Sequence, residues 1–292
     1  MKRQWLGDDH DVRKYCLLKY IYQTLDNIPI IINWMITEEE SQKEQQIAFE
    51  NNLCDNNSIL ILANDISDYK HKHDTRHFDG IITILKNHKI EITPFSNKLP
   101  NITNVIANNQ SMKQRNQRDI CKQLRKNWLL KFIETIKRDS IVFFDPNNGL
   151  EIPSLKKSVT RIKSDNYIFC EEILSTLNNG HVKGVFVYQH ALLFGEGTRQ
   201  EEAIKTRVGQ IKTAIAEKTK LGEKTDSNIN GLSIFVFLGA ENNDIKESYI
   251  LLIKPDYSGK IPQDLSLKIN EYKISTFSVE IFQNGTWKCL TQ

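Results

Sequence analysis

The sequence predicts an α/β fold in which a mostly parallel sheet is covered by helices on both faces, a three-layer sandwich. Uninterrupted apolar runs at 140–144, 184–190 and 231–238 are typical of strands that are buried on both faces. Segments with helical periodicity separate these runs, as expected of an α/β domain. A fourth apolar run at 248–255 follows the third after a short polar turn. These last two strands should therefore form an antiparallel C-terminal hairpin at the sheet edge.

The first half of the chain alternates helical and strand patterns. After the cap residues Asp8, Asp9 and Asp11, apolar side chains recur at spacings of three and four, which predicts an N-terminal helix. The apolar run 28–36 predicts the first strand. The other patterns of this half predict a charged helix at 37–52, a strand or buried helix at 58–63, a helix at 77–87 and a short strand at 105–107.

Three helices are predicted between the strands of the second half. A long amphipathic helix at 110–138 carries Trp128 and Phe132 on its apolar stripe. A short helix follows at 171–177. Thr198 and Glu201 have the spacing of a capping box, which should open a helix that extends to about Lys220. The final segment should add an edge strand or a small hairpin.

The chain reads as one domain, because neither an internal repeat nor a Pro/Gly/Ser-rich linker divides residues 1–292. We divide it into an N-terminal helix that lines the pocket, a divergent first half, a catalytic-side half and a C-terminal edge extension. Their bounds are 1–27, 28–139, 140–256 and 257–292.

The composition, 39% hydrophobic and 26% charged residues, is that of a globular protein. The sequence has no apolar run of about 18 residues and no apolar stretch after its basic start, so it predicts neither a membrane span nor a secretory signal. The five cysteines form no CxxC pair, which argues against a disulfide framework or a zinc knuckle. We therefore expect a cytoplasmic protein with no membrane partner.

The best single candidate for chemistry is Asp145, which directly follows the apolar run 140–144. Such a residue emerges at the carboxyl end of a buried strand, where open α/β sheets bind their ligands. Asn148 and Glu151 follow on the same turn, and His190 ends the next strand at the same edge. These side chains could accept protons or, for Asp145 with Glu151, bind a divalent metal through oxygen. The alternative is that Asp-Pro and Asn-Gly only form a tight turn.

Two segments resemble known families. Residues 7–18, GDDHDVRKYCLL, resemble the N-terminal helix of the bacterial ribosomal-RNA adenine-N6 methyltransferases, where a Gly-Asn-His-Ala-Asp-Val-Leu-Lys-His pattern lines the pocket. Residues 143–151, FFDPNNGLE, resemble the Asp-Pro-Pro-Tyr motif of amino-methyltransferases. Both segments are similar to uncharacterised bacterial proteins with Phe-Phe-Asp-Pro-Asp-Asn-Gly-Leu-Glu, and three-Cys-motif partner proteins are distantly similar.

The resemblance implies a Rossmann-like methyltransferase fold that acts on nucleic acid with S-adenosylmethionine as its cofactor. Asp145 would stand at the catalytic turn, and Asp11 and Lys14 would contribute to the cofactor pocket. The sequence departs from the pattern in two places. The first strand is followed by no glycine until Gly80, and Asn147 and Asn148 replace the Pro and Tyr of the motif.

These departures leave two other functions open. One is a metal-dependent nuclease or phosphoester hydrolase, with Asp145, Glu151 and Asp11 as oxygen ligands to Mg or Mn. The other is a non-catalytic partner protein in a bacterial defence or restriction system. A nucleic-acid partner could contact the basic segment 112–126. The alternative, which the pattern slightly favours, is a solvated helix face. The candidate phosphate contacts of the segment are Lys113, Arg115, Arg118, Lys122, Arg125 and Lys126.

Overall fold

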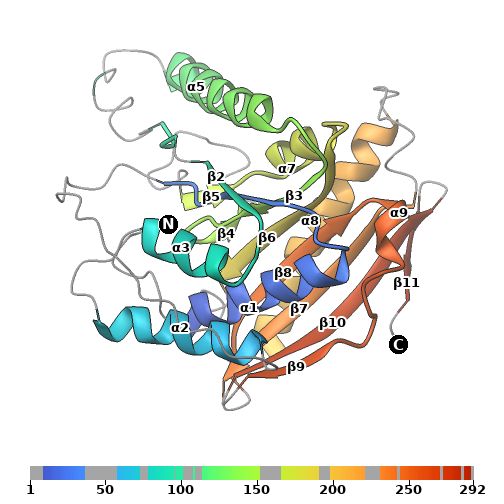
Figure 1. Cartoon of the computed structure of the whole chain (residues 1–292). Helices are drawn as coiled ribbons and strands as arrows, with labels where there is room; N and C mark the ends of the chain where they lie inside the picture. The colour runs from blue at the N-terminus through green and yellow to red at the C-terminus, as the bar shows by residue number, and fades with distance from the viewer. Residues whose placement is uncertain are drawn as a thin grey trace.

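A large central sheet organises the protein, with helices on both faces and antiparallel strands at its C-terminal side (Figure 1). The computed structural model describes residues 9–36, 58–72, 78–95, 97–100, 108, 114–151, 166–190, 198–220, 231–241, 244–269, 272–283 and 286–290. Within these residues the strand order is β11-β10-β7-β8-β6-β3-β1-β2, and β9 pairs with β10.

Four adjacent strands form the parallel half of the sheet: β1 (Ile30–Asn33), β2 (Ile92–Phe95), β3 (Ser140–Phe144) and β6 (Val182–His190). The antiparallel half consists of β7 (Ser233–Glu241), β8 (Asp244–Ile253), β9 (Ser266–Ile269), β10 (Tyr272–Gln283) and β11 (Thr286–Cys289). A separate two-stranded sheet pairs β4 (Gly149–Leu150) with β5 (Tyr167–Ile168) directly after β3. The mixed α/β class, the adjacent parallel strands and the antiparallel C-terminal strands are as predicted.

The helices divide between the two faces, because each face has its own apolar core (Figure 1). One core receives α1 (Asp9–Thr24), α2 (Ser58–Lys72) and α3 (Phe78–Asn87). The other receives α5 (Gln114–Thr135), α7 (Cys170–Leu177) and α8 (Thr198–Lys220). A short helix, α9 (Pro255–Ser258), follows β8. Successive strand residues alternate between the cores, so that Phe143 enters the first and Phe144 the second.

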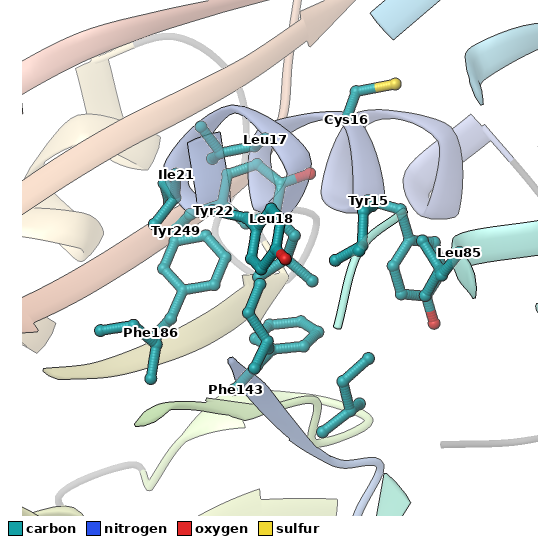
Figure 2. Packing of buried hydrophobic residues seen from close by; sticks show 14 of the residues in the cluster. Tyr15, Cys16, Leu17, Leu18, Ile21, Tyr22, Leu85, Phe143, Phe186 and Tyr249 are labelled. Atoms are coloured by element: carbon teal, nitrogen blue, oxygen red, sulfur yellow. The ribbon is translucent and has the colours of Figure 1, made fainter. Parts of the chain in front are cut away.

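Helix α1 packs along the first face of the sheet (Figure 2). Its apolar side chains, among them Leu18 and Ile21, lie above the aromatic rings of Phe143, Phe186 and Tyr249. The rings of Phe143 and Phe186 are 5.2 Å apart, and those of Phe186 and Tyr249 are stacked at 5.8 Å. Aromatic contacts of this kind add to the free energy gained by burial alone. This packing fixes the position of α1 relative to β3, β6 and β8.

Three details differ from the sequence prediction or complete it. The segment at 58–63 is helical and begins α2, which resolves the alternative between strand and helix. Strand β2 was not predicted, because its four residues include a proline. The predicted hairpin of β7 and β8 is antiparallel, but it is not at the sheet edge: β8 lies between β6 and β7, and β10 and β11 extend the sheet beyond β7. The elements expected at 37–52 and 105–107 lie outside the described residues.

The close approach of β6 to β8 gives a test of this sheet. A Cβ added at Gly184 would lie 2.8 Å from the backbone oxygen of Leu252 on β8, whereas a Cβ at Gly180 has nothing within 4 Å. Overpacking at such a site typically costs about 1–3 kcal/mol. We therefore expect Gly184→Ala to lower the free energy of unfolding in urea by that amount, and the control Gly180→Ala to change it by less than about 0.5 kcal/mol. Equal effects would contradict the β6–β8 register.

Candidate functional site

The carboxyl ends of the parallel strands bring several predicted site residues to one edge of the sheet. Asn33 ends β1, and Asp145 directly follows β3. The backbone N–H of Asp145 donates a hydrogen bond to the carbonyl oxygen of Asn33 at 3.0 Å. Strand β6 extends to His190, so that Tyr188, Gln189 and His190 reach the same edge. The parallel strand order thus gathers these residues where α/β sheets bind their ligands.

The first turns of α1 supply the partner of Asp145. The ammonium Nζ of Lys14 donates to Oδ1 of Asp11 at 2.6 Å and to Oδ2 of Asp145 at 3.0 Å. It also lies 4.9 Å from the centre of the Tyr188 ring. The three charged residues are at most 2% exposed. The two segments that carry the family resemblance, which are far apart in the sequence, therefore meet in one buried ionic group.

The two carboxylates beside Lys14 determine its charge. Burial by itself lowers the pKa of the ammonium, but the nearby carboxylates of Asp11 and Asp145 outweigh burial and raise the pKa well above its ordinary value. Lys14 is therefore a permanent cation at neutral pH. Within the group of Asp11, Lys14 and Asp145, two carboxylates share one cation. Such a group favours a ligand that brings an N–H donor or a positive charge.

A second ionic group, centred on Glu247 of β8, lies at the same edge of the sheet. The sequence patterns did not predict it. Arg13 donates to both oxygens of the Glu247 carboxylate, through Nε to Oε1 and through Nη2 to Oε2 at 3.0 Å. His10 Nδ1 lies 2.5 Å from Oε2, and the Tyr249 hydroxyl donates to Oε1 at 3.0 Å. Burial raises the pKa of Glu247, but the hydrogen bonds and charges of His10 and Arg13 outweigh it, so the net pKa is lowered.

The predicted site residue His190 is half-buried beside this second group. Its ring centre is 5.3 Å from that of His10 and 6.2 Å from that of Tyr188. In the register of the sheet, His190 is directly opposite Glu247 on β8. The Tyr188 ring contacts both Lys14 and His190. His190 is thus adjacent to the Glu247 group, and the Tyr188 ring lies between it and Lys14 in this series of contacts.

The turn after Asp145 is held by Gln189. The Gln189 side chain accepts a hydrogen bond from the N–H of Leu150 at 2.8 Å and donates to the carbonyl of Asn148 at 3.1 Å. Gly149 has a φ of +92°, and a Cβ there would clash with the Gln189 side chain. Asn148 itself is half-buried. The turn is therefore built for a close approach of backbone to side chain.

Glu151 lies in a different environment from the one predicted. Its carboxylate Oε1 accepts a hydrogen bond from the backbone N–H of Cys170 at 3.1 Å, at the start of α7. Its backbone oxygen accepts one from Arg207 Nη1 at 3.1 Å. Glu151 therefore joins this turn to α7 and α8, as an acidic group at a helix start does. In the described part of the chain, no group of three or more His, Cys, Asp or Glu side chains is placed to hold a metal ion.

The basic segment divides into exposed and buried residues. Lys122 and Lys126 are exposed on α5. Arg125 is 4% exposed: its Nη2 donates to Glu172 Oε2 at 2.9 Å, and its guanidinium lies 4.4 Å from the centre of the Phe169 ring. This corrects the expectation that Arg125 contacts phosphates, because its charge is used inside the protein. Lys113 and the side chains of Arg115 and Arg118 lie outside the described residues.

The residues after β1 do not fit the glycine turn through which the resemblance would hold S-adenosylmethionine. Trp34 is 1% exposed, lies 4.7 Å from the Phe78 ring and donates through Nε1 to the Tyr15 hydroxyl at 2.9 Å. Met35 is fully buried and has a φ of +47°. Bulky buried side chains therefore occupy positions at which a close backbone approach to a cofactor requires glycine.

Comparisons with protein-family models, curated proteins and solved structures gave no match for this chain. Among the described helices, none is both long enough and apolar enough to cross a membrane.

The Glu247 group predicts a large effect on stability. Glu247→Gln removes the carboxylate that pairs with buried Arg13, and breaking a buried ion pair costs about 3–5 kcal/mol. The control Glu280→Gln breaks the partly exposed pair with Lys212, which should cost less than about 1 kcal/mol. Urea unfolding at neutral pH measures both. A small effect of Glu247→Gln would show that Arg13 does not depend on this carboxylate.

The same group predicts a dependence on pH. The folded-state pKa of Glu247 is lowered, so its stabilisation is present above the unfolded pKa of about 4.3 and is lost as the pH falls through the lower folded value. We expect the wild type to lose more free energy of unfolding between about pH 6 and about pH 3 than Glu247→Gln does. Parallel curves for the two proteins would contradict the lowered pKa.

Proposed function

We propose that this protein is a methyltransferase-fold enzyme that acts on nucleic acid, with Asp145 as the acceptor of an amino N–H of the target base. The observation that carries this proposal is the contact between Lys14 of α1 and Asp145 after β3, at 3.0 Å. It joins the N-terminal helix, which resembles that of the ribosomal-RNA adenine methyltransferases, to the strand end, which resembles the Asp-Pro-Pro-Tyr motif of amino-methyltransferases. Apart from the small separate sheet of β4 and β5, the order from β3 to β8 is strand, helix, strand, helix, strand, strand, which supports the same fold.

The chemistry of the group suits an amino substrate. Lys14 binds Oδ2 of Asp145, and no described residue donates a hydrogen bond to Oδ1. Oδ1 is therefore the atom to which a substrate N–H would donate. An amino group that becomes more positive during the reaction would be stabilised by the carboxylates of Asp11 and Asp145. Because residues 33–36 do not form a glycine turn, we derive no step through S-adenosylmethionine.

A second candidate is a binding protein that has kept the fold without transferring a methyl group, as in the partner protein of a bacterial defence or restriction system. It is favoured by Trp34 and Met35, whose buried side chains occupy the turn after β1. Both candidates bind a base at Asp145, and only the first changes the base chemically. The metal-dependent hydrolase has no such support, since Glu151 is bound to the start of α7.

Asp145→Asn tests the proposal. The purified protein is incubated with S-adenosylmethionine and with bacterial RNA or DNA, and the digested nucleosides are analysed by mass spectrometry. We expect wild-type protein to produce a methylated amino base and Asp145→Asn to be at least about 100-fold slower. The control is Asp139→Asn, an exposed carboxylate at the other end of the same strand, which should keep full activity.

The outcomes separate the candidates. Methyl transfer that survives Asp145→Asn would contradict the site. Absence of transfer, combined with nucleic-acid binding that Asp145→Asn weakens, would favour the binding protein. If Asp145→Asn lost neither nucleic-acid binding nor methyl transfer, Asp145 would have no role in either function.

The exposed lysines of α5 predict an interaction with the phosphate backbone. The double variant Lys122→Ser with Lys126→Ser should weaken oligonucleotide binding and reduce the slope of log affinity against log salt by about 1 for each phosphate that is no longer neutralised. Lys86→Ser is the control, since Lys86 is exposed on α3 at the opposite face of the sheet. An unchanged slope, measured by fluorescence anisotropy at several salt concentrations, would exclude this helix from the interface.

A further inference from the structure

Asn33, at the carboxyl end of β1, is a buried polar residue whose side chain is only half satisfied. It is 1% exposed. Its Oδ1 accepts a hydrogen bond from the backbone N–H of Met35 at 3.0 Å. Its Nδ2 has no hydrogen-bond partner among the described residues. Buried amide groups are almost always paired, because an unpaired donor loses its bonds to water without replacing them.

The direction of this donor is fixed. Only the oxygen of the amide can accept the N–H of Met35, so the side chain cannot exchange its oxygen and nitrogen without losing that bond. Met35 holds a φ of +47°, a conformation that is uncommon for a residue other than glycine. The turn after β1 therefore keeps the Nδ2 donor in one orientation. An arrangement of this kind is expected where a ligand supplies the missing partner.

Asn33 also lies at the position where a ligand is expected. Strand β1 pairs with β2 on one side and with β3 on the other, so the direction in which strands are added reverses between β1 and β3. Open α/β sheets bind ligands outside the strand ends at such a reversal. Asn33 and Asp145 are the residues that flank it, joined by the 3.0 Å backbone hydrogen bond.

The two side chains approach the strand ends from opposite faces. Ile31 and Met35 are two residues before and two residues after Asn33, and both belong to the core on the side of α5. Strand residues two apart point to the same face, so Asn33 is on the side of α5. Asp145 is contacted by Lys14 from α1, on the other side. A flat ligand beyond the strand ends would lie between an acceptor on one face and a donor on the other.

We propose that Asn33 is a recognition residue whose Nδ2 donates a hydrogen bond to an acceptor atom of the base that Asp145 holds by its amino group. This inference rests on the proposed function for the class of ligand. Adenine, cytosine and guanine each have an exocyclic amino group and a ring acceptor, so each can supply both partners. Uracil and thymine lack the exocyclic amino group on which the proposed function depends.

The test uses nucleosides and their deaza analogues, in which one ring nitrogen is replaced by carbon. Adenosine, cytidine and guanosine are titrated into the full-length protein by calorimetry, and the analogues of the tightest binder follow. We expect Asn33→Leu to weaken binding of the parent nucleoside about 10-fold. One deaza analogue should bind the wild-type protein about 10-fold more weakly than the parent nucleoside does. The affinity for that analogue should be the same in Asn33→Leu as in wild type.

Asn33→Asp is the second variant, because it keeps an acceptor for the N–H of Met35 and replaces the donor with an oxygen. Asn33→Asp should weaken binding of the parent nucleoside at least as strongly as Asn33→Leu does. Its thermal unfolding transition should remain cooperative. If Asn33→Leu weakened binding of the parent nucleoside and of all its analogues equally, the inference would be overturned, because Asn33 would then act only through the turn.

The other outcomes distinguish this inference from the proposed function. If Asp145→Asn weakens nucleoside binding and neither Asn33 variant changes it, the role of Asn33 is overturned and the proposed function stands. Failure of wild-type protein to bind any of the three nucleosides at millimolar concentration would overturn both.

Discussion

The ionic contacts between the start of α1 and the strand ends are the interaction on which the rest of this structure depends. Asp11, Asp145 and Glu247 are buried carboxylates, and each is paired with a cation of α1, either Lys14 or Arg13. A buried charge without a partner is costly, so none of these groups could remain buried if α1 were displaced. The helix is therefore held at the sheet edge by charge as well as by its apolar face.

Helix α1 thus contacts the sheet through two separate sets of side chains, one apolar and one charged. Its apolar residues pack on the aromatic rings of β3, β6 and β8, and this packing sets its distance from the sheet. Its polar first turns project to the edge where the parallel strands end, and there they meet Asp145 and Glu247. The candidate site is rigid for this reason: its residues come from a packed helix and from strand ends. Tyr188, which contacts both Lys14 and His190, connects the two ionic groups.

Much of the fold and part of the site could be predicted from local patterns. The buried strands β3, β6, β7 and β8 each contain an apolar run, and the helices between them carry their own periodicity. Asp145 was recognisable because a carboxylate after such a run must emerge at the strand end. Glu247 was not, since it lies inside a polar stretch whose burial depends on the pairing of β8 with β6. Arg125 and Glu151 were misplaced for the same reason: a charged residue shows its partner only when the elements are packed.

The sequence by itself determined the class of fold, the order of β3, β6, β7 and β8 with the helices between them, and the position of Asp145, because these follow from apolar periodicity that neighbouring residues share. It also determined that Asp11 and Lys14 lie on one side of a helix, since residues three apart do so in any helix. Only the tertiary structure decided that Lys14 reaches Asp145, that β8 lies inside the sheet, and that Asn33 keeps an unpaired donor among the described residues. These features depend on residues far apart in the chain, and they exist only because the burial of two apolar cores brings those residues together.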